Sequence, residues 1–225
     1  MQRTKIDWCD STLNPVVGCT FGCPFCYARR MNTRFKWIED FSKPQFFPER
    51  LKALYSKKPQ TIFMDSMSDI ADWHSDWIER TFITMRDNPQ HKYLFLTKRM
   101  VDYGEKDVTN YDLLFETNAS KNVLFGSSIT KQSGFDGLDE YGQISDFLSV
   151  EPILEPINLN KYRMLKYVKW VIVGAETGNR KEKVIPKHKW LQDIVCQCKI
   201  LHIPIFMKSS LKDIWGEPLI QEFPW

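Results

Sequence analysis

The fold is decided by the stretch Trp170-Val171-Ile172-Val173-Gly174-Ala175-Glu176-Thr177-Gly178, near the end of this 225-residue chain. Its first six residues, 170–175, are all apolar or small, and the polar residues Glu176 and Thr177 follow directly. Continuous apolar runs of this length are typical of strands buried on both faces of a parallel sheet, whereas half-exposed strands alternate. The stretch therefore predicts a buried parallel strand whose carboxyl end carries polar side chains.

The same pattern recurs along the chain and alternates with helix-forming segments. The other predicted strands are Asn14–Gly18, Thr61–Met64, Tyr93–Leu96, Val123–Gly126, Phe147–Val150 and Ile203–Met207, with Lys43–Phe47 as a further candidate. The predicted helices are Pro24–Arg34, Pro48–Ser56, Asp76–Asp87, Tyr111–Asn118 and His188–Leu201, with Pro48 in a first turn and Asp76 as an N-cap. Strand–helix alternation predicts an α/β fold. We expect one domain over residues 1–225, a partial or complete (β/α) TIM-like barrel rather than an open doubly wound sheet.

Polar or small residues follow almost every predicted strand. In a parallel barrel the carboxyl ends of all strands open on one face, where active sites are built. We therefore expect these residues to line one cavity. They are Cys19 and the segments 65–69, 97–99, 127–128, 151–152, 176–178 and 208–210.

Composition excludes several classes of protein. An apolar fraction of 43% and a charged fraction of 26% are ordinary for a globular chain. The apolar runs stay well short of the roughly 20 residues that span a bilayer, and the first residues lack a signal peptide. The net charge of +3 is spread over scattered Lys and Arg residues, so charge alone identifies no nucleic-acid binder. We expect a cytoplasmic protein that does not enter a membrane.

Three of the six cysteines lie together in the segment Gly18–Ala28, with the spacing C-x3-C-x2-C. Thiolates suit iron–sulfur clusters or zinc, but a structural zinc site needs four ligands and the nearest histidine is His74. A 4Fe–4S cluster normally takes four thiolates. With three, one iron stays open to a small molecule, as S-adenosylmethionine (SAM) requires in order to chelate it. The spacing predicts a 4Fe–4S cluster on Cys19, Cys23 and Cys26 that cleaves SAM reductively to a 5′-deoxyadenosyl radical.

The residues between these cysteines fit a compact loop. Gly18 and Gly22 permit tight turns, and Pro24 is placed to start the helix that carries Cys26. The loop of residues 19–26 can then fold three thiolates around one cluster.

The other cysteines are interpreted separately. Cys196 and Cys198 stand two apart in a predicted helix, where such positions do not face each other, so at least one is expected to be buried packing. Cys9 is a candidate for a reactive residue near the site. Too few thiolates remain for a second cluster.

With these residues in view, the chain resembles the phage Gp37/Gp68-like (DUF5131) family, in the radical SAM superfamily. Two departures stand out: Thr12-Leu13 replaces a Thr-Trp pair, and Gly174-Ala175-Glu176 replaces Gly-Gly-Glu. The resemblance implies the barrel and both cofactors, but no substrate. It rests on residues 7–8, 14–19, 22–28, 48–51, 65–69, 96–99, 149–153, 171–178 and 204–208.

Residues near the cysteines are expected to bind SAM. Tyr27 directly follows the last cysteine and is expected near the adenine. Ser66 and Ser68 correspond to the place where radical SAM enzymes contact the SAM amino group. The alternative is a loop capped by Asp65 and Ser66.

The middle and late strand ends supply further candidates. Ser127 and Ser128 are expected to meet ribose hydroxyls or the SAM carboxylate, which Lys98 and Arg99 could neutralise. A neighbouring group, Asp69, Asp72 and His74, is either a metal site or solvated surface.

Two carboxylates, Glu151 and Glu176, are expected to contact ribose hydroxyls or a cationic substrate. The alternative is a salt bridge at the barrel mouth, with Lys208 as partner to one of them.

The leading hypothesis is a radical SAM enzyme acting on a small molecule, a nucleic acid or a protein, with an electron donor such as flavodoxin or ferredoxin. One alternative is an iron–sulfur protein for electron transfer or redox sensing without SAM turnover. Another is a nucleic-acid-binding module with a structural zinc.

Overall fold

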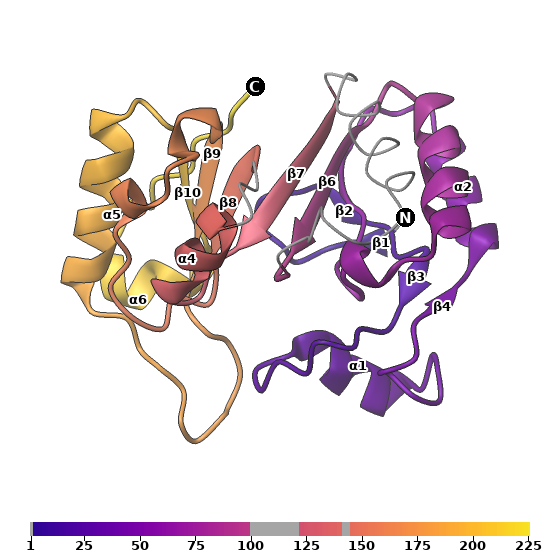
Figure 1. Cartoon of the computed structure of the whole chain (residues 1–225), viewed down its shortest axis with the longest axis horizontal. Helices are drawn as coiled ribbons and strands as arrows, with labels where there is room; N and C mark the ends of the chain where they lie inside the picture. The colour runs from indigo at the N-terminus through magenta and orange to yellow at the C-terminus, as the bar shows by residue number, and fades with distance from the viewer. Residues whose placement is uncertain (1, 100–121, 141–144) are drawn as a thin grey trace. The chain divides into compact units, whose positions relative to one another are not determined.

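The computed structural model describes residues 2–99, 122–140 and 145–225 (Figure 1). The chain has a mixed α/β fold, which confirms the predicted class. It consists of two compact units, one of Met1–Thr97 with Asp102–Leu124 and one of Lys98–Val101 with Phe125–Trp225. The single domain over residues 1–225 stays a prediction.

Parallel strands form the core of the first unit. They follow the order β1-β2-β5-β6, in which β2, β5 and β6 are parallel and β1 is antiparallel to β2. Ile62, Tyr93 and Leu94 are completely buried, as the continuous apolar runs predict. The strands are β1 (Gln2–Arg3), β2 (Ser11–Thr12), β5 (Thr61–Phe63) and β6 (Lys92–Thr97).

The prediction that Asn14–Gly18 is a strand of the parallel sheet was wrong. This segment contributes β3 (Val16–Val17), which pairs antiparallel with β4 (Gln45–Phe46) in a separate two-stranded sheet. The candidate strand Lys43–Phe47 is thereby confirmed. β5 pairs in parallel with β6 and, on its other edge, with β2, which carries no apolar run.

The change of sheet has a local cause. The amide of Leu13 donates to the carbonyl of Phe63 at 3.0 Å, which extends the pairing of β2 with β5. Pro15 follows two residues later and has no N–H with which to continue a ladder. The chain therefore leaves the parallel sheet before β3.

The two α-helices of the first unit begin at residues other than those predicted. α1 (Tyr27–Phe35) starts after Cys26, which is its N-cap, rather than at Pro24. α2 (Ser75–Arg86) has His74 at the N-cap position, so Asp76 lies in the first turn.

Two 3₁₀ helices complete the first unit. Pro48 is the first residue of η1 (Pro48–Tyr55), as predicted, and η2 (Ile70–Asp72) precedes α2. The predicted helix Tyr111–Asn118 lies outside the described residues.

The second unit also consists of parallel strands covered by helices. Its strands follow the order β7-β8-β9-β10 and are all parallel to their neighbours. They are β7 (Val123–Ser128, of which 125–128 belong to this unit), β8 (Phe147–Val150), β9 (Trp170–Val173) and β10 (Ile205–Met207). The helices are α4 (Ser133–Glu140), η3 (Leu159–Lys161), η4 (Leu165–Tyr167), α5 (His188–Ile200), η5 (Ser209–Leu211) and α6 (Lys212–Trp215).

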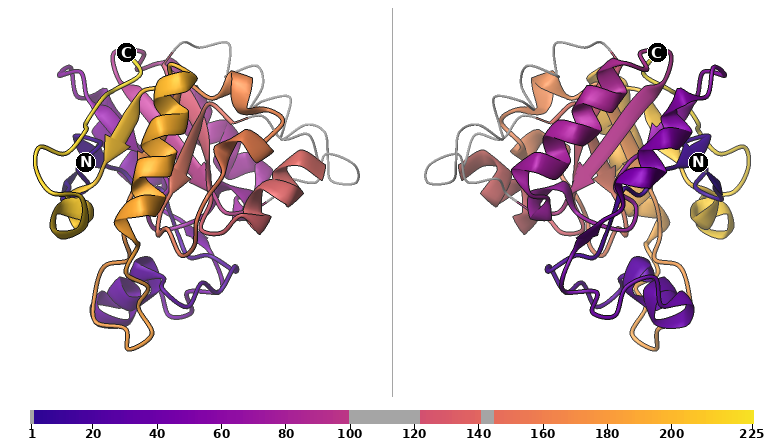
Figure 2. Two further views of the ribbon diagram at one scale, coloured as in Figure 1. Left: turned by 90° about the vertical axis from the view of Figure 1, so that its left-hand side faces the viewer. Right: turned by 90° about the vertical axis from the view of Figure 1, so that its right-hand side faces the viewer.

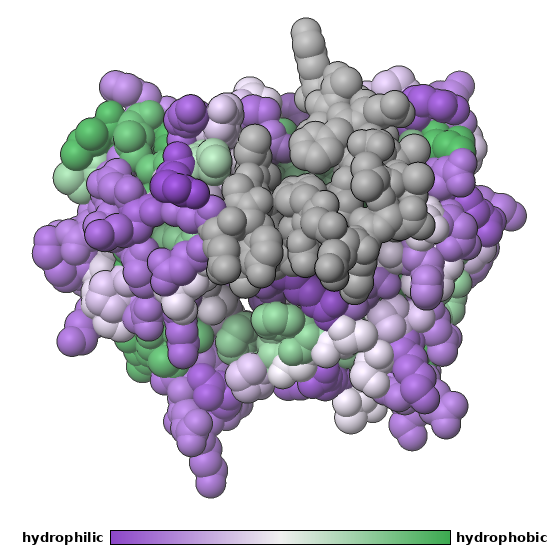
Figure 3. Space-filling model, in the orientation of Figure 1, coloured by the Kyte–Doolittle hydropathy of each residue, from purple (hydrophilic) through white to green (hydrophobic). Residues whose placement is uncertain are grey.

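Each unit carries a long helix packed on its strands. Figure 2 shows α5 across the strands of the second unit in the left view and α2 along those of the first in the right view. Leu191 and Ile194 of α5 are completely buried in one cluster with Val171 and Val173 of β9. Among the coloured residues on the face drawn in Figure 3, hydrophilic ones predominate.

The two cysteines of α5 lie in different environments. Cys196 is exposed, whereas Cys198 is completely buried in the core cluster. This confirms that positions two apart do not share a face. Burial raises the pKa of Cys198 to about 12.

We predict that a thiol reagent labels Cys196 and spares Cys198 in the folded protein. A pKa near 12 leaves Cys198 with a thiolate fraction roughly a few thousandfold below that of an ordinary cysteine of pKa about 8.5. Iodoacetamide labelling at about pH 8, read by peptide fragmentation, measures both sites. Cys196→Ser should remove the label from α5 and Cys198→Ser should leave it; equal labelling of both residues in the native protein would contradict the burial.

Candidate functional site

The cysteine loop, residues 19–26, connects β3 to α1 in the first unit. Cys19, Cys23 and Cys26 are all half-buried. Cys19 and Cys26 pack against a small apolar cluster formed by Val17, Ala28, Ile38, Phe41 and Met67. One side of the loop therefore packs on this apolar cluster, and its half-buried cysteines lie at the boundary between core and solvent.

Backbone amides donate hydrogen bonds to two of these sulfurs. The amide of Phe21 donates to Cys19 Sγ at 3.4 Å, and the amide of Arg29 donates to Cys26 Sγ at 3.3 Å. Hydrogen bonds to cluster sulfurs are one means by which proteins tune an iron–sulfur site. The second of these bonds also caps α1.

The beginning of the loop is anchored to η2. Asp72 accepts from the amide of Thr20 at 2.8 Å and from its hydroxyl at 2.9 Å. The amide of Cys19 donates to the carbonyl of Phe41 at 2.8 Å. Asp72 is thus a loop anchor, a role that no local sequence signal could reveal because its partner lies 52 residues away.

The structure brings Tyr27, Ser66 and Ser68 beside the cysteine loop. The Tyr27 hydroxyl donates to the carbonyl of Ser66 at 2.6 Å. Ser68 forms a parallel bridge with Gly18, and its hydroxyl accepts from Trp73 Nε1 at 3.0 Å. The predicted neighbours of the cysteines therefore meet at this loop, and their contacts with SAM stay predictions.

Asn14 is a positioning residue that sequence reasoning missed. Its Oδ1 accepts from the Ser66 hydroxyl at 3.0 Å and from the amide of Met67 at 2.9 Å. Its main-chain carbonyl accepts from Arg50 Nη1 at 2.8 Å. The Asn14-Pro15 dipeptide, a turn signal, was the available clue.

The three cysteine thiols of the loop are the type of ligand that an iron–sulfur cluster requires. Three thiols stand on one short loop, half-buried, and all six cysteines of the chain are thiols rather than disulfides. Within the described ranges, however, no three His, Cys, Asp or Glu side chains are gathered closely enough to hold a metal ion. Gly22 has a φ of +75°, and nothing lies within 4 Å of the position that a Cβ would take there. The space beside Gly22 is thus open.

In the grouping of Asp69, Asp72 and His74, both carboxylates are engaged in hydrogen bonds. Asp69 Oδ1 accepts from the Thr97 hydroxyl at 2.7 Å and from the amide of Ala71 at 3.1 Å. With Asp72 bound to the cysteine loop, both carboxylates hold η2 in place. The structure gathers no metal-holding group from them in the part of the chain that it describes.

The candidates at the end of β7 lie in the second unit. Lys98 Nζ donates to the Ser128 hydroxyl at 3.3 Å. Ser127 is buried, and its hydroxyl lies 2.7 Å from that of Ser145, which is also buried. Ser128 and Lys98 are therefore the more accessible pair.

Both late carboxylates form ion pairs, which confirms the salt-bridge alternative. Glu151 pairs with Lys208, as anticipated. A Cβ at Gly174 would lie 3.0 Å from Lys208 Cδ and 3.1 Å from Glu151 Cγ, so the glycine makes room for this pair.

Glu176 pairs with Arg180, a partner that the sequence did not indicate. Arg180 Nε and Nη2 donate to the two carboxylate oxygens at 2.7 and 2.8 Å. These hydrogen bonds hold the pKa of the Glu176 carboxyl below its usual range. The carboxylate is almost fully buried, so the arginine compensates its desolvation.

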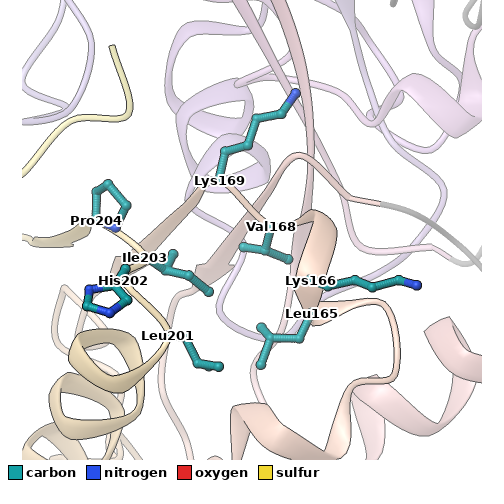
Figure 4. Close-up of a pocket in the computed structure, with 8 residues that line it drawn as sticks. All are labelled: Leu165, Lys166, Val168, Lys169, Leu201, His202, Ile203 and Pro204. Atoms are coloured by element: carbon teal, nitrogen blue, oxygen red, sulfur yellow. The ribbon is translucent and has the colours of Figure 1, made fainter.

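A pocket of about 230 Å³ in the second unit is no candidate for the site (Figure 4). It lies beside the residues that precede β9 and β10. Active sites of parallel α/β folds lie at the carboxyl ends of strands, not at their amino ends. Its lining is Leu165, Lys166, Val168, Lys169, Leu201, His202, Ile203 and Pro204.

One family model matches almost the whole chain. The family is described as "Protein of unknown function (DUF5131)", and the match covers residues 3–218. No curated protein and no solved structure matches the chain. Among the helices of the described ranges, none is both long and apolar enough to cross a membrane.

Gly18 and Gly22 should differ sharply in their tolerance of a side chain. Gly18 has a φ of +114°, and a Cβ there would lie 2.7 Å from Pro44 Cα, which is backbone and cannot swing away. We expect Gly18→Ala to lower the free energy of unfolding by at least about 2 kcal/mol, through strain and overlap together. Gly22→Ala meets no atom and should cost about 1 kcal/mol from its φ alone. Urea unfolding measures both, and an equal or larger loss at Gly22 would refute the packing described for Gly18.

Acid should remove the stabilisation that comes from the Glu176–Arg180 pair. Because the folded-state pKa of Glu176 is lowered, this stabilisation is fully present above the ordinary glutamate pKa of about 4.3 and is lost as pH falls through the folded-state value. Arg180→Gln should therefore destabilise the protein most near neutral pH, and the difference from wild type should shrink towards about pH 3. Urea unfolding across this range is the measurement. The control is Arg86→Gln, which removes the guanidinium of an exposed pair with Asp87. A deficit for Arg180→Gln that does not change with pH would contradict this account.

Proposed function

We propose that this chain, which belongs to the family of unknown function DUF5131, is an enzyme that holds a 4Fe–4S cluster on Cys19, Cys23 and Cys26 and cleaves SAM reductively. The observation that carries the proposal is the loop itself: three half-buried thiols with spacing C-x3-C-x2-C between a strand and a helix. Bound there, the cluster would supply the electron that converts SAM to methionine and a 5′-deoxyadenosyl radical, for use on a substrate not yet identified.

The residues around the loop support the assignment by what they hold in place. Asp72 fixes Thr20, and the amides of Phe21 and Arg29 already point at two of the sulfurs. Cluster binding requires the three sulfurs to draw together, and the open surroundings of Gly22 leave room for that.

SAM recognition by the first unit is proposed for three residues beside the loop. Tyr27 is 45% exposed, and its hydroxyl donates to the carbonyl of Ser66. Ser66 and Ser68 offer hydroxyl groups whose positions are set by Asn14 and Trp73. These side chains are placed to orient an adenine and an amino group.

The other predicted SAM contacts are also part of the proposal. They divide into residues that are accessible and residues that are already engaged in hydrogen bonds or ion pairs. Lys98 and Ser128 are accessible at the end of β7 and could serve an anionic group. Contacts from Ser127, Glu151 or Glu176 would require their bonds to Ser145, Lys208 or Arg180 to open.

The finer assignment of the fold belongs to the same proposal. Parallel strands connected through helical segments, with polar residues at their carboxyl ends, support a partial or complete (β/α) barrel of the radical SAM type. Cytoplasmic location and reduction by a flavodoxin or ferredoxin are proposed with it.

Anaerobic reconstitution followed by dithionite and SAM tests the function. We expect a brown protein with about four irons per chain. We also expect an EPR signal of the reduced protein that changes when SAM is added, and 5′-deoxyadenosine by mass spectrometry. Cys23→Ala should abolish the cluster and the product. Cys26→Ser should do the same while it keeps an N-cap on α1, because serine caps helices well but is a poor ligand for iron.

Cys196→Ala is the matched control, since Cys196 is exposed on α5 outside the loop and its loss should leave iron content and product unchanged. A brown protein whose EPR signal ignores SAM and which yields no 5′-deoxyadenosine would establish the electron-transfer alternative instead. A colourless protein that takes up zinc would establish the structural-zinc alternative.

A further inference from the structure

The helix that follows the cysteine loop presents large side chains to solvent. In α1, Tyr27, Met31 and Phe35 are spaced four apart, so they line one stripe, and Arg30 and Arg34 stand next to it. We name this set, together with Trp37, the α1 surface. Its aromatic and methionine side chains are 38–49% exposed: Tyr27, Met31, Phe35 and Trp37.

This part of the chain is strongly basic, although the chain as a whole is nearly balanced. Between residues 19 and 38 there are four basic residues and no acidic one. Where α1 lies in Figure 1, Figure 3 shows pale and hydrophilic side chains side by side. Positive charge is thus mixed with aromatic surface rather than separated from it.

The rings at the end of α1 are held as a platform. Phe35 and Trp37 stack with centroids 5.2 Å apart and planes inclined by 22°. The guanidinium of Arg34 lies 5.2 Å from the Phe35 centroid. When a partner covers exposed aromatic rings of this kind, the burial makes the free energy of binding more favourable.

The backbone beyond the helix is shaped to hold this platform. Lys36 has a φ of +50°, in the left-handed region that costs a non-glycine residue about 1 kcal/mol or more. The buried Asn32 side chain donates to the carbonyl of Ile38 at 2.9 Å and accepts from its amide at 3.1 Å. Trp37 is therefore fixed between two constrained residues, so little freedom is lost when a partner binds.

We propose that the α1 surface binds single-stranded nucleic acid. Phosphates would pair with Arg30, Arg34 and Lys36, and unpaired bases would stack on Phe35 and Trp37. Positive charge combined with exposed rings is how proteins bind single strands without reading sequence. An acidic peptide would need the charges but not the rings, and a duplex keeps its bases stacked away from them.

The position of the surface connects it with the cysteine loop. Tyr27 belongs to the α1 surface and directly follows Cys26, so a strand lying along α1 reaches the loop. The inference rests on the proposed function in taking the bound strand to be the substrate. Binding itself needs neither SAM nor a reductant, so the two ideas can fail separately.

Fluorescence anisotropy with the full, anaerobically reconstituted chain tests the proposal without SAM or dithionite. The probes are fluorescein-labelled RNA and DNA single strands of about 20 nucleotides, longer than the roughly 4–16 that comparable sites cover, and the matching duplex. We expect the single strands to bind about tenfold more tightly than the duplex, with affinity that falls as salt rises. The stronger of the two single strands identifies the kind of nucleic acid.

Variants of the α1 surface separate stacking from charge. Trp37→Ala should weaken binding at least about fivefold, because a stacking base contributes about 1–3 kcal/mol. The double variant Arg30→Gln, Arg34→Gln should weaken binding and reduce the slope of log K against log salt by about 1 to 2. The control Lys57→Gln, Lys58→Gln makes the same change in net charge at exposed residues outside α1 and should bind like wild type.

Three results would overturn the proposal. They are the absence of binding to either single strand, equal losses in the lysine control, and displacement by polyglutamate with no effect of Trp37→Ala, which would mark an acidic protein as the partner. Circular dichroism of each variant shows that these surface substitutions leave the fold intact. If the chain binds single strands but forms no 5′-deoxyadenosine, the α1 surface is a binding site and the proposed function is wrong. If it forms 5′-deoxyadenosine but binds no single strand, only the proposed binding site is wrong.

Discussion

The close approach of two backbone segments at Gly18 is the constraint on which the candidate site depends. The segment carrying Gly18 passes so near Pro44 that a side chain has no room, and its amide bonds the carbonyl of Met67. This contact brings the end of β3 against residues 65–68, so that the loop of Cys19 begins next to Ser66 and Ser68. If the segment of Gly18 lay further from Pro44 and Met67, the apolar cluster that packs against the loop could not form. Nor could Asp72 reach Thr20.

Much of the fold could be predicted because buried parallel strands leave a plain pattern. The runs at β5, β6, β8 and β9 are continuous and apolar because both faces of each strand are covered. β2 left no such pattern, since Ser11 and Thr12 are polar and the strand is held by its pairing with β5. The start of α1 was misplaced because a first-turn proline and a cysteine N-cap compete as signals, and the geometry of the loop favours the cysteine.

The candidate site was only half readable from sequence. Spacing alone picked out Cys19, Cys23 and Cys26, since ligands on one loop are local. The contacts that position the loop, from Asp72 and Asn14, join segments about fifty residues apart and leave no periodic trace. Charge pairing was an alternative for both Glu151 and Glu176, with Lys208 as partner to one of them, but Arg180 as the partner of Glu176 could not be chosen among several nearby cations.

Cys26 occupies the N-cap position of α1, where other residues would stabilise the helix more. Serine, threonine, aspartate and asparagine are the preferred N-caps, and a thiol is a weak acceptor by comparison. A single point mutation in a cysteine codon yields serine, so the alternative has always been within reach. The stability of the helix therefore does not account for a sulfur at this N-cap. Directed evolution for thermal stability would be expected to replace Cys26 early, and selection for activity to restore it.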